Sequence, residues 1–507
     1  MIIQQNLIMP KYDVVIIGSG LGGLLCGNIL SKEGLSVCVL EKHHQAGGCL
    51  QNFTREGCVF DTGIHYVGSL DEGQVLNRYF KYFGILDKLP LKRLDADGFD
   101  VISFANENKE YKYAMGAEGF VDKLSEAFPK ERASLKKYMQ RIKDVSDHFP
   151  LYNISDVQAD VSETSMYGEN AESVIGSLTQ DPLLQKILAG TSPLYAGVRE
   201  KTPFYVHALV NYSFIESSYR IVNGSAQIAD LLVDSIKANG GTVLTRAEAQ
   251  TFDFSDNQIS SVMLSNGEVI EGRNFISDIH PASTLEMIPD GYIRKAYRNR
   301  IMQLENTLSS FSVYIVFKKN RFPYFNYNLY YYKNDDVWDS SVYSPGKAAD
   351  NFLLLTPAVT MDDHWADSIV IMSYMHYDEV KQWENTRIGK RGPDYEAFKK
   401  ARAEQLINLV EERLPGFRSH IHSYYSSSPL TYRDYTGTPQ GSLYGVLKDC
   451  TDPLKSLISP RTKIPNLLLT GQNIILHGAL GVTIAAVTTC SEILGLSYLV
   501  NKIKAVS

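Results

Sequence analysis

A glycine-rich turn between a predicted strand and a predicted helix constrains the fold of this chain more than any other feature. Residues 12–17, "YDVVII", form a short, continuous, β-branched run, as in a strand buried inside a parallel sheet. A glycine turn that opens a helix follows, and "SVCVLEK" at 36–42 reads as a second strand. A strand, a helix and a parallel strand within about 30 residues are the β-α-β unit of a doubly wound sheet.

The spacing of the glycines in this turn predicts a dinucleotide site. Gly18, Gly20 and Gly23 form G-x-G-x-x-G, which combines a tight turn, close approach to a diphosphate and close packing of helix on sheet. The N-terminus of the helix offers unpaired N–H groups to the phosphates. Glu41 ends the second strand, where a carboxylate accepts hydrogen bonds from a ribose. We therefore predict dinucleotide binding rather than a purely structural glycine turn.

The length of 507 residues exceeds what one hydrophobic core usually organises, so two or more domains are expected. The pattern of glycine turn, helix and strand returns at 223–245, and the C-terminal segment reads as strand, glycine turn and a helix opening at Gly481. We predict an α/β fold, in which a Rossmann-like, doubly wound dinucleotide-binding domain is interleaved with an α+β substrate domain that contains a mixed or antiparallel sheet. The predicted cofactor domain comprises residues 11–90, 218–290 and 436–507, and the predicted substrate domain comprises residues 91–217 and 291–435.

Composition excludes several classes of function. The net charge of -7 gives no concentrated basic face for nucleic acid. The six cysteines form no C-x-x-C pair and no zinc pattern, so we predict free thiols, a reducing compartment and no metal. The N-terminal segment lacks the features of a signal peptide, and no apolar run reaches the ~20 residues of a membrane span. We predict a cytoplasmic protein, with peripheral contact to the inner face of a membrane as an open alternative.

The residues that follow Glu41 extend the glycine motif. Lys42 comes next, then Gly47 and Gly48, and then "FDTG" at 60–63. This pattern resembles the FAD-binding signature of the phytoene desaturase and amine oxidase-like superfamily. "NGSAQIADLLVDSIKANGGTVLTRAEA" is similar to the middle segment of that superfamily, and "LLLTGQNIILHGALGVTIAA" is similar to its C-terminal flavin motif. The resemblance therefore implies FAD as the cofactor.

The resemblance also implies where FAD is held. Gly471 to Asn473 would lie by the ribityl chain and diphosphate, and Gly481 to Thr483 would present a helix N-terminus to the flavin, where a helix dipole stabilises negative charge on the reduced ring. The middle segment would close over the adenine near Ala249. The implied FAD-binding residues are Gly18, Gly20, Gly22, Gly23, Glu41, Lys42, Gly47, Gly48, Gly63, Ile64, Ala249, Gly471, Gln472, Asn473, Gly481, Val482 and Thr483.

One branch of the superfamily fits best. Many amine oxidases carry Arg where this chain has Cys49, whereas "GGCLQNF", "FDTGIHYVG" and "GTPQGSLYGV" resemble retinol saturases and their carotenoid isomerase relatives. Asn473 departs from the Asp that retinol saturases generally carry there. The resemblance implies reduction of a C=C bond in a hydrophobic polyene or isoprenoid-type substrate. Carotenoid isomerisation, desaturation, amine oxidation and non-enzymatic binding of prenyl groups or lipids remain alternatives. NAD(P)H, a protein or a quinone are candidate electron donors.

Three side chains are candidates for proton transfer or for walls of the substrate site. Reduction of a C=C bond adds a hydride at one carbon and a proton at the other. His65, whose unperturbed pKa is near ~6.5, and Tyr66 follow the "DTG" turn, and Tyr444 lies in the late loop. The alternative for His65 is a hydrogen-bonded structural histidine. The aromatic segment 311–332 predicts either a lipophilic pocket or bilayer-facing surface, or ordinary buried strands.

Overall fold

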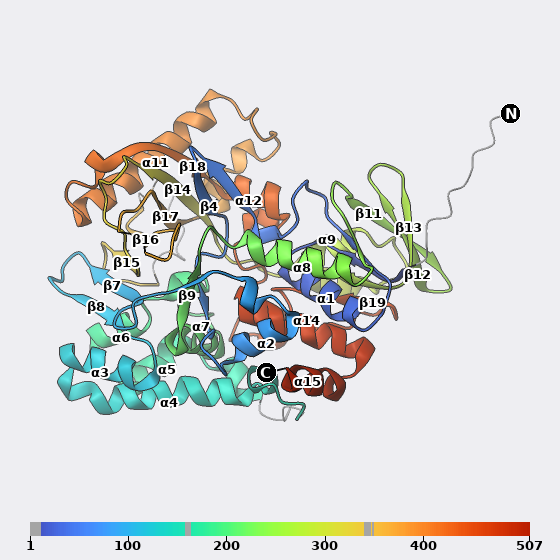
Figure 1. Ribbon diagram of the computed structural model, residues 1–507, viewed down its shortest axis with the longest axis horizontal. Helices are drawn as coiled ribbons and strands as arrows, with labels where there is room; N and C mark the ends of the chain where they lie inside the picture. The colour runs from blue at the N-terminus through green and yellow to red at the C-terminus, as the bar shows by residue number, and fades with distance from the viewer. Residues whose placement is uncertain (1–11, 158–163, 339–345, 347–348, 363, 507) are drawn as a thin grey trace. The chain divides into compact units, whose positions relative to one another are not determined.

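The computed structural model describes residues 12–157, 164–338, 346, 349–362 and 364–506 (Figure 1). The chain forms two compact units, each assembled from separate stretches of sequence. The first unit comprises residues 1–51, 227–304 and 458–499, and the second comprises residues 52–226, 305–457 and 500–507.

Interleaving of the chain is therefore a property of the structure. The predicted domains were defined by their expected function. They assign residues 52–90 and 436–457 to the cofactor domain, whereas backbone packing places both stretches in the second unit. The role-based domain boundaries stay a prediction.

A parallel sheet organises the first unit. Its parallel strands follow the order β10, β2, β1, β13 and β19, and a hairpin of β12 and β11 continues antiparallel from the start of β13. This arrangement confirms the predicted Rossmann-like α/β fold. The strands of the unit are β1 (Tyr12–Ile17), β2 (Val37–Leu40), β10 (Thr242–Leu244), β11 (Ala249–Ser255), β12 (Gln258–Leu264), β13 (Val269–Ser277) and β19 (Leu467–Leu469).

The first helix, α1, packs closely on this sheet because several of its residues are glycines, which carry no side chain. Helix α1 contacts β1, β2 and α14. A Cβ atom on Gly27 would lie 2.8 Å from Cδ1 of Ile236 on α8, so glycine is what lets these two helices approach each other. The helices that belong wholly or mainly to this unit are α1 (Leu21–Lys32), α8 (Ala226–Ala238), α9 (Pro281–Glu286), α10 (Lys295–Met302) and α14 (Gly478–Leu494), with the 3-10 turn η1 (Gly48–Leu50).

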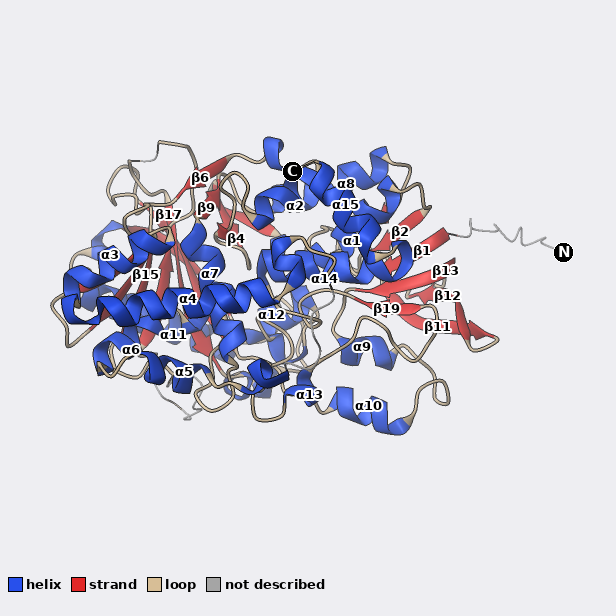
Figure 2. Ribbon diagram, turned by 90° about the horizontal axis from the view of Figure 1, so that it is seen from below, coloured by secondary structure: helices blue, strands red, loops and turns tan. Residues whose placement is uncertain are grey.

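A second sheet of mixed orientation organises the second unit. Its seven strands follow the order β18, β14, β17, β16, β15, β7 and β8, and β7 pairs with β15 in parallel while the other pairs are antiparallel. Figure 2 draws the strands in red and the helices in blue. The prediction of an α+β part with a mixed sheet is confirmed. The strands of this sheet are β7 (Asp100–Phe104), β8 (Glu110–Tyr113), β14 (Ser309–Phe317), β15 (Asn328–Tyr332), β16 (Asn351–Leu355), β17 (Ser368–Met375) and β18 (Ile421–Ser427).

The aromatic segment 311–332 contributes two strands to this sheet, joined by a loop at 318–327 that is mostly exposed or half-buried. Every residue of β14 and of β15 is buried, as expected where β-branched and aromatic side chains fill a sheet. Tyr331 belongs to the core that α11 covers, and the hydroxyl of its neighbour Tyr332 donates to the carbonyl of Gly190, 2.8 Å away. Successive residues of a strand face opposite sides, so the segment builds both faces of the sheet. The buried-strand alternative is correct, and a bilayer-facing role for β14 and β15 is not supported.

Helices and two small sheets complete the second unit. The small sheets contain β3 (Asn52–Arg55), β4 (Cys58–Asp61), β5 (Val67–Gly68), β6 (Leu91–Arg93) and β9 (Ser218–Ile221). Among the described helices, none is long and apolar enough to cross a membrane. The helices are α2 (Val75–Phe83), α3 (Ala117–Ala127), α4 (Arg132–His148), α5 (Ala171–Leu178), α6 (Pro182–Leu188), α7 (Phe204–Glu216), α11 (Pro393–Arg413), α12 (Pro429–Thr436) and α13 (Pro453–Ser456), and α15 (Leu496–Ala505) ends the chain.

Candidate functional site

The carboxyl ends of the parallel strands in the first unit carry the predicted cofactor residues. Ile17 of β1 pairs with Leu40 of β2 on one side and with Ser277 of β13 on the other, and Ser277 pairs with Leu469 of β19. The residues that leave this edge of the sheet next include Gly18, Glu41 and Asp278. Cofactors of doubly wound folds bind at this edge, because helix N-termini point there.

Glycines bring the first turn and the C-terminal segment into contact. Gly18 has a φ of +94°, which favours glycine at the turn. A Cβ atom on Gly22 would lie 2.9 Å from Cα of Gly471, and one on Gly23 would collide with the carbonyl oxygen of Gly18. The two ends of the predicted cofactor site, more than 400 residues apart in sequence, therefore meet in one unit.

Glu41 is held in a fixed orientation at the end of β2. Its Oε2 accepts from the backbone N–H and the hydroxyl of Ser19, at 3.3 and 2.5 Å, and its Oε1 accepts from the backbone N–H of His43 at 2.8 Å. The side chain is buried, whereas Lys42 is exposed. The backbone N–H of Ala247 donates to the Glu41 carbonyl, which positions the chain just before Ala249, the first residue of β11.

The Gly-Gly pair after Glu41 packs on the first turn. Gly47 has a φ of +119° and donates its N–H to the carbonyl of Ser19 at 3.0 Å. A Cβ atom on Gly48 would lie 3.2 Å from Cα of Gly20. These contacts show why the extended motif needs two small residues there: the loop and the first turn form one surface. We call the backbone surface made by Gly18 to Gly23, Gly47, Gly48 and Gly471 the glycine cradle.

The C-terminal helix begins earlier than the sequence predicts. We expected it to open at Gly481, but α14 starts at Gly478, whose φ of +77° turns the chain into the helix. Gly481 serves a different purpose: a Cβ atom there would lie 2.6 Å from the carbonyl oxygen of Leu476. From the sequence, both glycines could be turn residues. The structure shows that Gly478 makes the turn, whereas Gly481 allows a close contact with Leu476.

A polar atom without a partner marks the first turns of α14. Thr483 is fully buried, and within the described part of the chain its hydroxyl has no hydrogen-bond partner. Buried polar groups are seldom left unpaired, because the lost hydration is costly. Val482, the preceding residue, is also buried, as is Asn473 in the segment before α14, and Gln472 is half-buried. An extended dinucleotide fits this donor set: glycine backbone at one end and a helix N-terminus with a spare hydroxyl at the other.

The predicted "DTGIHY" stretch lies in the second unit. Asp61 ends β4, and one of its carboxylate oxygens accepts from the backbone N–H and the hydroxyl of Ser225, both at 2.7 Å. Burial raises the pKa of Asp61 to about 6, against these hydrogen bonds and the charge of Arg220, which lower it. Gly63 is exposed and Ile64 is half-buried.

Tyr66 takes part in a buried hydrogen-bond network. Its hydroxyl lies 2.7 Å from the hydroxyl of Tyr330 and donates to the carboxylate of Asp100 at 3.1 Å. Asn328 donates to the other oxygen of Asp100 at 2.7 Å, and Arg220 donates to Asn328 at 3.0 Å. Burial raises the pKa of Asp100 to about 7, while the bonds from Asn328 and Tyr66 lower it. This network can hold a proton near neutral pH.

Four members of this network were absent from our sequence prediction. Asp100, Tyr330, Asn328 and Arg220 all sit on strands that read as ordinary sheet strands. A weak signal was present, because Asp100 opens an otherwise apolar strand and Asn328 opens "NLYYY". Charged and amide side chains are rarely placed in such strands without a buried partner.

His65 has an environment that favours its neutral form. Burial and the charge of Arg220 lower its pKa to about 4. Within the described residues, its Nε2 is enclosed and has no hydrogen-bond partner. At neutral pH the imidazole is therefore uncharged and can accept a proton more readily than it supplies one. Its predicted catalytic part stays a prediction.

Tyr444 is anchored to the backbone. Its hydroxyl donates to the carbonyl of Pro193 at 2.9 Å, and the same carbonyl accepts from the hydroxyl of Tyr374 at 2.5 Å. The charge of an ionised Tyr444 also contributes to the raised pKa of Tyr66, so the two tyrosines are electrostatic neighbours. Tyr66 and Tyr444 are thus brought into one region of the second unit, as a pair of predicted site residues.

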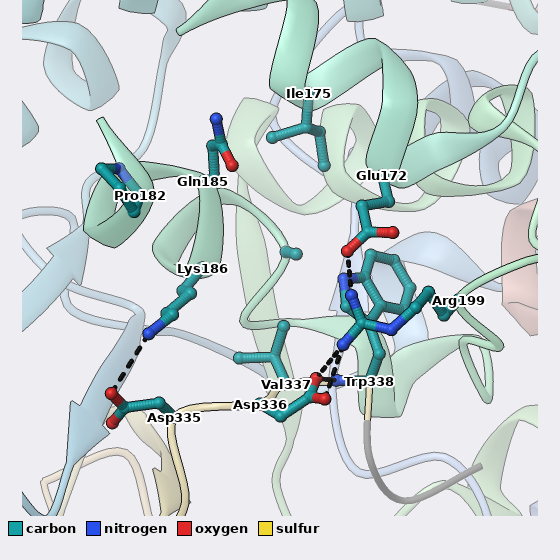
Figure 3. Close-up of a pocket in the computed structure, with 11 residues that line it drawn as sticks. Glu172, Ile175, Pro182, Gln185, Lys186, Arg199, Asp335, Asp336, Val337 and Trp338 are labelled. Atoms are coloured by element: carbon teal, nitrogen blue, oxygen red, sulfur yellow. Dashed lines mark hydrogen bonds and ion pairs between the residues drawn. The ribbon is translucent and has the colours of Figure 1, made fainter. Parts of the chain in front are cut away.

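A separate pocket of about 320 Å³ lies on the second unit (Figure 3). Its charged side chains are paired: Arg199 with Glu172 and Asp336, and Lys186 with Asp335 at 3.2 Å. None of the predicted site residues lines it. The pocket therefore adds nothing to the two sites described above.

The described residues contain no cluster of three or more His, Cys, Asp or Glu side chains suited to a metal ion. All six cysteines are free thiols. The N-terminal segment before residue 12 lies outside the described residues.

The class of protein that this fold and this cradle define is a dinucleotide-dependent oxidoreductase. Residues 16–83 match the family described as NAD(P)-binding Rossmann-like domain. All-trans-retinol 13,14-reductase from Homo sapiens is 29% identical, with 97% of this chain and 87% of that protein covered. Chloroplastic prolycopene isomerase from Daucus carota is 23% identical over 86% of this chain and 74% of its own length. The resemblance to the retinol saturase and carotenoid isomerase branch is confirmed.

Solved structures support the fold. An oxidoreductase from Methanosarcina mazei superposes with a TM-score of 0.64 at 15% identity and covers 93% of this chain and 98% of its own. Putrescine oxidase bound to putrescine superposes with a TM-score of 0.63 at 14% identity, covering 96% and 99%. These similarities establish the architecture, which spans both units of the chain.

Proposed function

We propose that this chain is an FAD-dependent oxidoreductase that reduces a C=C bond of a hydrophobic polyene or isoprenoid-type substrate. The observation that carries the proposal is the similarity to all-trans-retinol 13,14-reductase along nearly the whole chain, together with an intact glycine cradle. Similarity over 97% of the chain includes the segments outside the Rossmann motif, where we place the substrate site.

FAD, rather than a nicotinamide nucleotide, is the proposed resident cofactor. The backbone around Gly20 would hold the diphosphate, Glu41 would accept from a ribose, and Thr483 on α14 would donate to the flavin ring. Two helix N-termini, those of α1 and α14, then serve one extended ligand. Bound flavin supplies the hydride in such a reduction. NAD(P)H as the source of electrons stays a prediction.

Tyr66 is the proposed donor of the proton that completes the reduction. Its hydroxyl contacts both the Tyr330 hydroxyl and the carboxyl group of Asp100. Because the pKa of Asp100 is raised to about 7, this carboxyl group is partly protonated at neutral pH. A protonated Asp100 can donate to the Tyr66 hydroxyl, which frees the phenol proton for transfer and then replaces it. Tyr66 would thus act as the donor and Asp100 as its nearby proton reservoir.

Isomerisation is the second candidate, favoured by the similarity to prolycopene isomerase. Both reactions need a flavin and a hydrophobic polyene, and they differ in whether hydrogen is gained. The hydrophobic polyene substrate is part of this proposal. So are the cytoplasmic location and the peripheral contact with a membrane.

Product mass decides between the candidates. Purified protein should be yellow, with the absorption of oxidised flavin; after anaerobic reduction it should be mixed with retinoids, carotenoids, quinones and amines. A product heavier by two hydrogens supports the saturase. A product of unchanged mass and altered retention time indicates an isomerase, and a loss of two hydrogens from oxidised enzyme indicates a desaturase. Colourless protein that FAD cannot reconstitute would favour a non-enzymatic lipid or prenyl binder.

A further inference from the structure

A carboxyl group lies inside the glycine cradle. Asp278 follows β13 directly, and its side chain reaches across the first turn of α1. A Cβ atom on Gly20 would lie 2.5 Å from its Oδ2, and Cβ atoms on Gly22 or Gly471 would collide with its Oδ1. The carboxyl group thus lies against the glycine backbone at which the motif predicts the diphosphate of a dinucleotide.

Asp278 also uses one of the backbone N–H donors that the N-terminus of α1 could offer to a phosphate. The backbone N–H of Gly23 donates to its carboxylate, so Asp278 caps α1 from another strand. Asp278 is half-buried.

The charge of Asp278 matters because a dinucleotide carries two negative charges on its diphosphate. An ionised carboxylate there would repel the ligand in a site of low dielectric. A protonated carboxyl group removes the repulsion and adds an O–H donor for a phosphate oxygen. Bringing cofactor and acid together therefore favours the neutral acid.

We propose that Asp278 binds the diphosphate of the cofactor in its protonated form, so that the protein takes up a proton when the cofactor binds. The inference rests on the proposed function in one respect, that the ligand is FAD. It makes Asp278 a cofactor-binding residue that the motif does not include, placed by β13 rather than by the glycine turn.

The surroundings of Asp278 agree with this assignment. Burial raises its pKa to about 7, the hydrogen bond from Gly23 opposes the shift, and the charge of Glu41 at the end of β2 adds to it. Cys49 in η1 is the other titratable neighbour, and burial together with Asp278 raises the pKa of that thiol to about 11. Near neutral pH, Cys49 is therefore an uncharged neighbour of Asp278.

Affinity for FAD should then depend on pH in a defined way. If only the protonated protein binds, affinity is constant below the pKa of Asp278 in the free protein and falls about tenfold per pH unit above it. The test is the dissociation constant of FAD for the full-length apoprotein, measured by flavin fluorescence from pH 6 to 8.5. Asp278→Asn should bind FAD with little pH dependence and more tightly than the wild type at pH 8.5. Asp256→Asn, an exposed acid of the same unit, should keep the wild-type slope.

A second measurement uses the unaltered protein, in case the variant does not fold. Calorimetric titration of apoprotein with FAD at pH 8, in buffers of different ionisation enthalpy, should report uptake of close to one proton. FAD binding without proton uptake, or an Asp278→Asn variant with the wild-type slope, would overturn the role of Asp278 and leave the proposed function standing. Failure of the wild-type protein to bind FAD at any pH would overturn the cofactor assignment itself.

Discussion

The neighbours of Tyr66 determine what proton-transfer chemistry its side chain can perform. In isolation a phenol is a weak acid, and burial together with Asp100 raises the pKa of Tyr66 well above its ordinary value. Its proton therefore leaves only as another arrives, and Asp100 is placed to supply it at 3.1 Å. The pairing of a high-pKa donor with a carboxyl group that titrates near neutrality is what makes the network suited to proton delivery.

Replacing Tyr66 tests this delivery. Tyr66→Phe removes only the hydroxyl, so FAD should stay bound while turnover falls by roughly 10²- to 10⁴-fold, the usual contribution of general acid catalysis. Tyr79→Phe is a matched control, because the Tyr79 hydroxyl is also buried but donates to the carbonyl of Leu151. Turnover measured under anaerobic conditions, with flavin content determined by absorbance, checks both. Equal rates in Tyr66→Phe and wild type would remove Tyr66 from the mechanism.

His65 permits a companion experiment. Because its imidazole is neutral near pH 7, we expect His65→Phe to keep FAD and to slow product formation less than Tyr66→Phe does. Single-turnover reduction of substrate by the reduced enzyme distinguishes the two variants. A larger loss in His65→Phe would make His65, and not Tyr66, the principal proton donor.

Gly20 would contribute in the opposite way, because the absence of a side chain leaves room for the diphosphate in the proposed site. Gly20→Val places a Cβ atom 2.5 Å from Oδ2 of Asp278 and fills the cradle, so FAD binding should be abolished. Gly119→Val is the control, since the nearest atom to its Cβ, on Ala114, is 3.7 Å away. Flavin content after purification is the measurement. Normal flavin content in Gly20→Val would contradict the position assigned to the diphosphate.

At the scale of elements, the entry into α14 decides how the flavin end of the cradle is built. Gly478 turns the chain, and Gly481 lets the first turn of the helix rest on the carbonyl of Leu476. The loop and the helix therefore behave as one rigid element that positions Thr483. A helix that began at Gly481 would leave residues 478–480 as loop and lose this contact.

Gly481→Ala tests the element. Alanine ordinarily favours a helix over glycine by about 1 kcal/mol, but the clash with Leu476 should reverse the sign and destabilise this unit by roughly 1–3 kcal/mol, with weaker FAD retention. Gly176→Ala in α5, where only the amide of Gln185 lies nearby at 3.9 Å, should be neutral or stabilising. Thermal release of flavin follows the first variant, and circular dichroism follows both. A stabilised Gly481→Ala would show that the contact with Leu476 is not restrictive.

At the scale of the whole molecule, the two units can be observed separately. All three tryptophans, Trp338, Trp365 and Trp383, belong to the second unit, whereas the glycine cradle belongs to the first. Tryptophan fluorescence therefore reports unfolding of the second unit, and flavin release reports the first. Variants such as Gly20→Val should change the flavin signal and leave the fluorescence transition close to that of the wild type.

This separation allows a pH prediction for the second unit. Folding raises the pKa of Asp100 from near 3.8 to about 7 and that of Asp61 to about 6, so the folded state binds more protons than the unfolded state between these values. Through these two carboxyl groups, the free energy of unfolding should fall as pH rises from about 4 to about 7. His65 and His207, whose pKa values are lowered to about 4 and about 3, oppose this slope below about pH 6.5, so the net fall should be clearest between about pH 6.5 and 7. Urea unfolding followed by tryptophan fluorescence measures the net slope.

Asp100→Asn isolates the contribution of one group to that slope. The variant should lose stability with rising pH less steeply than the wild type, and the difference should be largest between pH 5 and 7, where Asp100 titrates in the folded state alone. Asp97→Asn, an exposed acid of the same unit, should follow the wild type in this range. Parallel curves for Asp100→Asn and wild type would mean that Asp100 is ionised throughout.

The sequence by itself determined the features that depend on local geometry. A glycine that avoids a clash, a β-branched run and an acid at the end of the next strand are constraints among near neighbours, so the strand–turn–helix around Gly18, Gly20 and Gly23 and the placement of Glu41 after β2 could be predicted from spacing alone. The second unit's mixed sheet was likewise readable as strands, because burial of both faces leaves continuous apolar runs.

Only the tertiary structure decided which polar groups meet. Tyr66 and Tyr330 are 264 residues apart. Asp278, which follows β13, lies beside the glycine turn that follows β1, far earlier in the sequence. Neither pairing leaves a periodic or spaced signal, because each partner is positioned by its own strand and the contact arises only when the strands are placed side by side. The pKa values of Asp100 and Asp278 follow from the same cause, since burial is created by packing and not by neighbours in sequence.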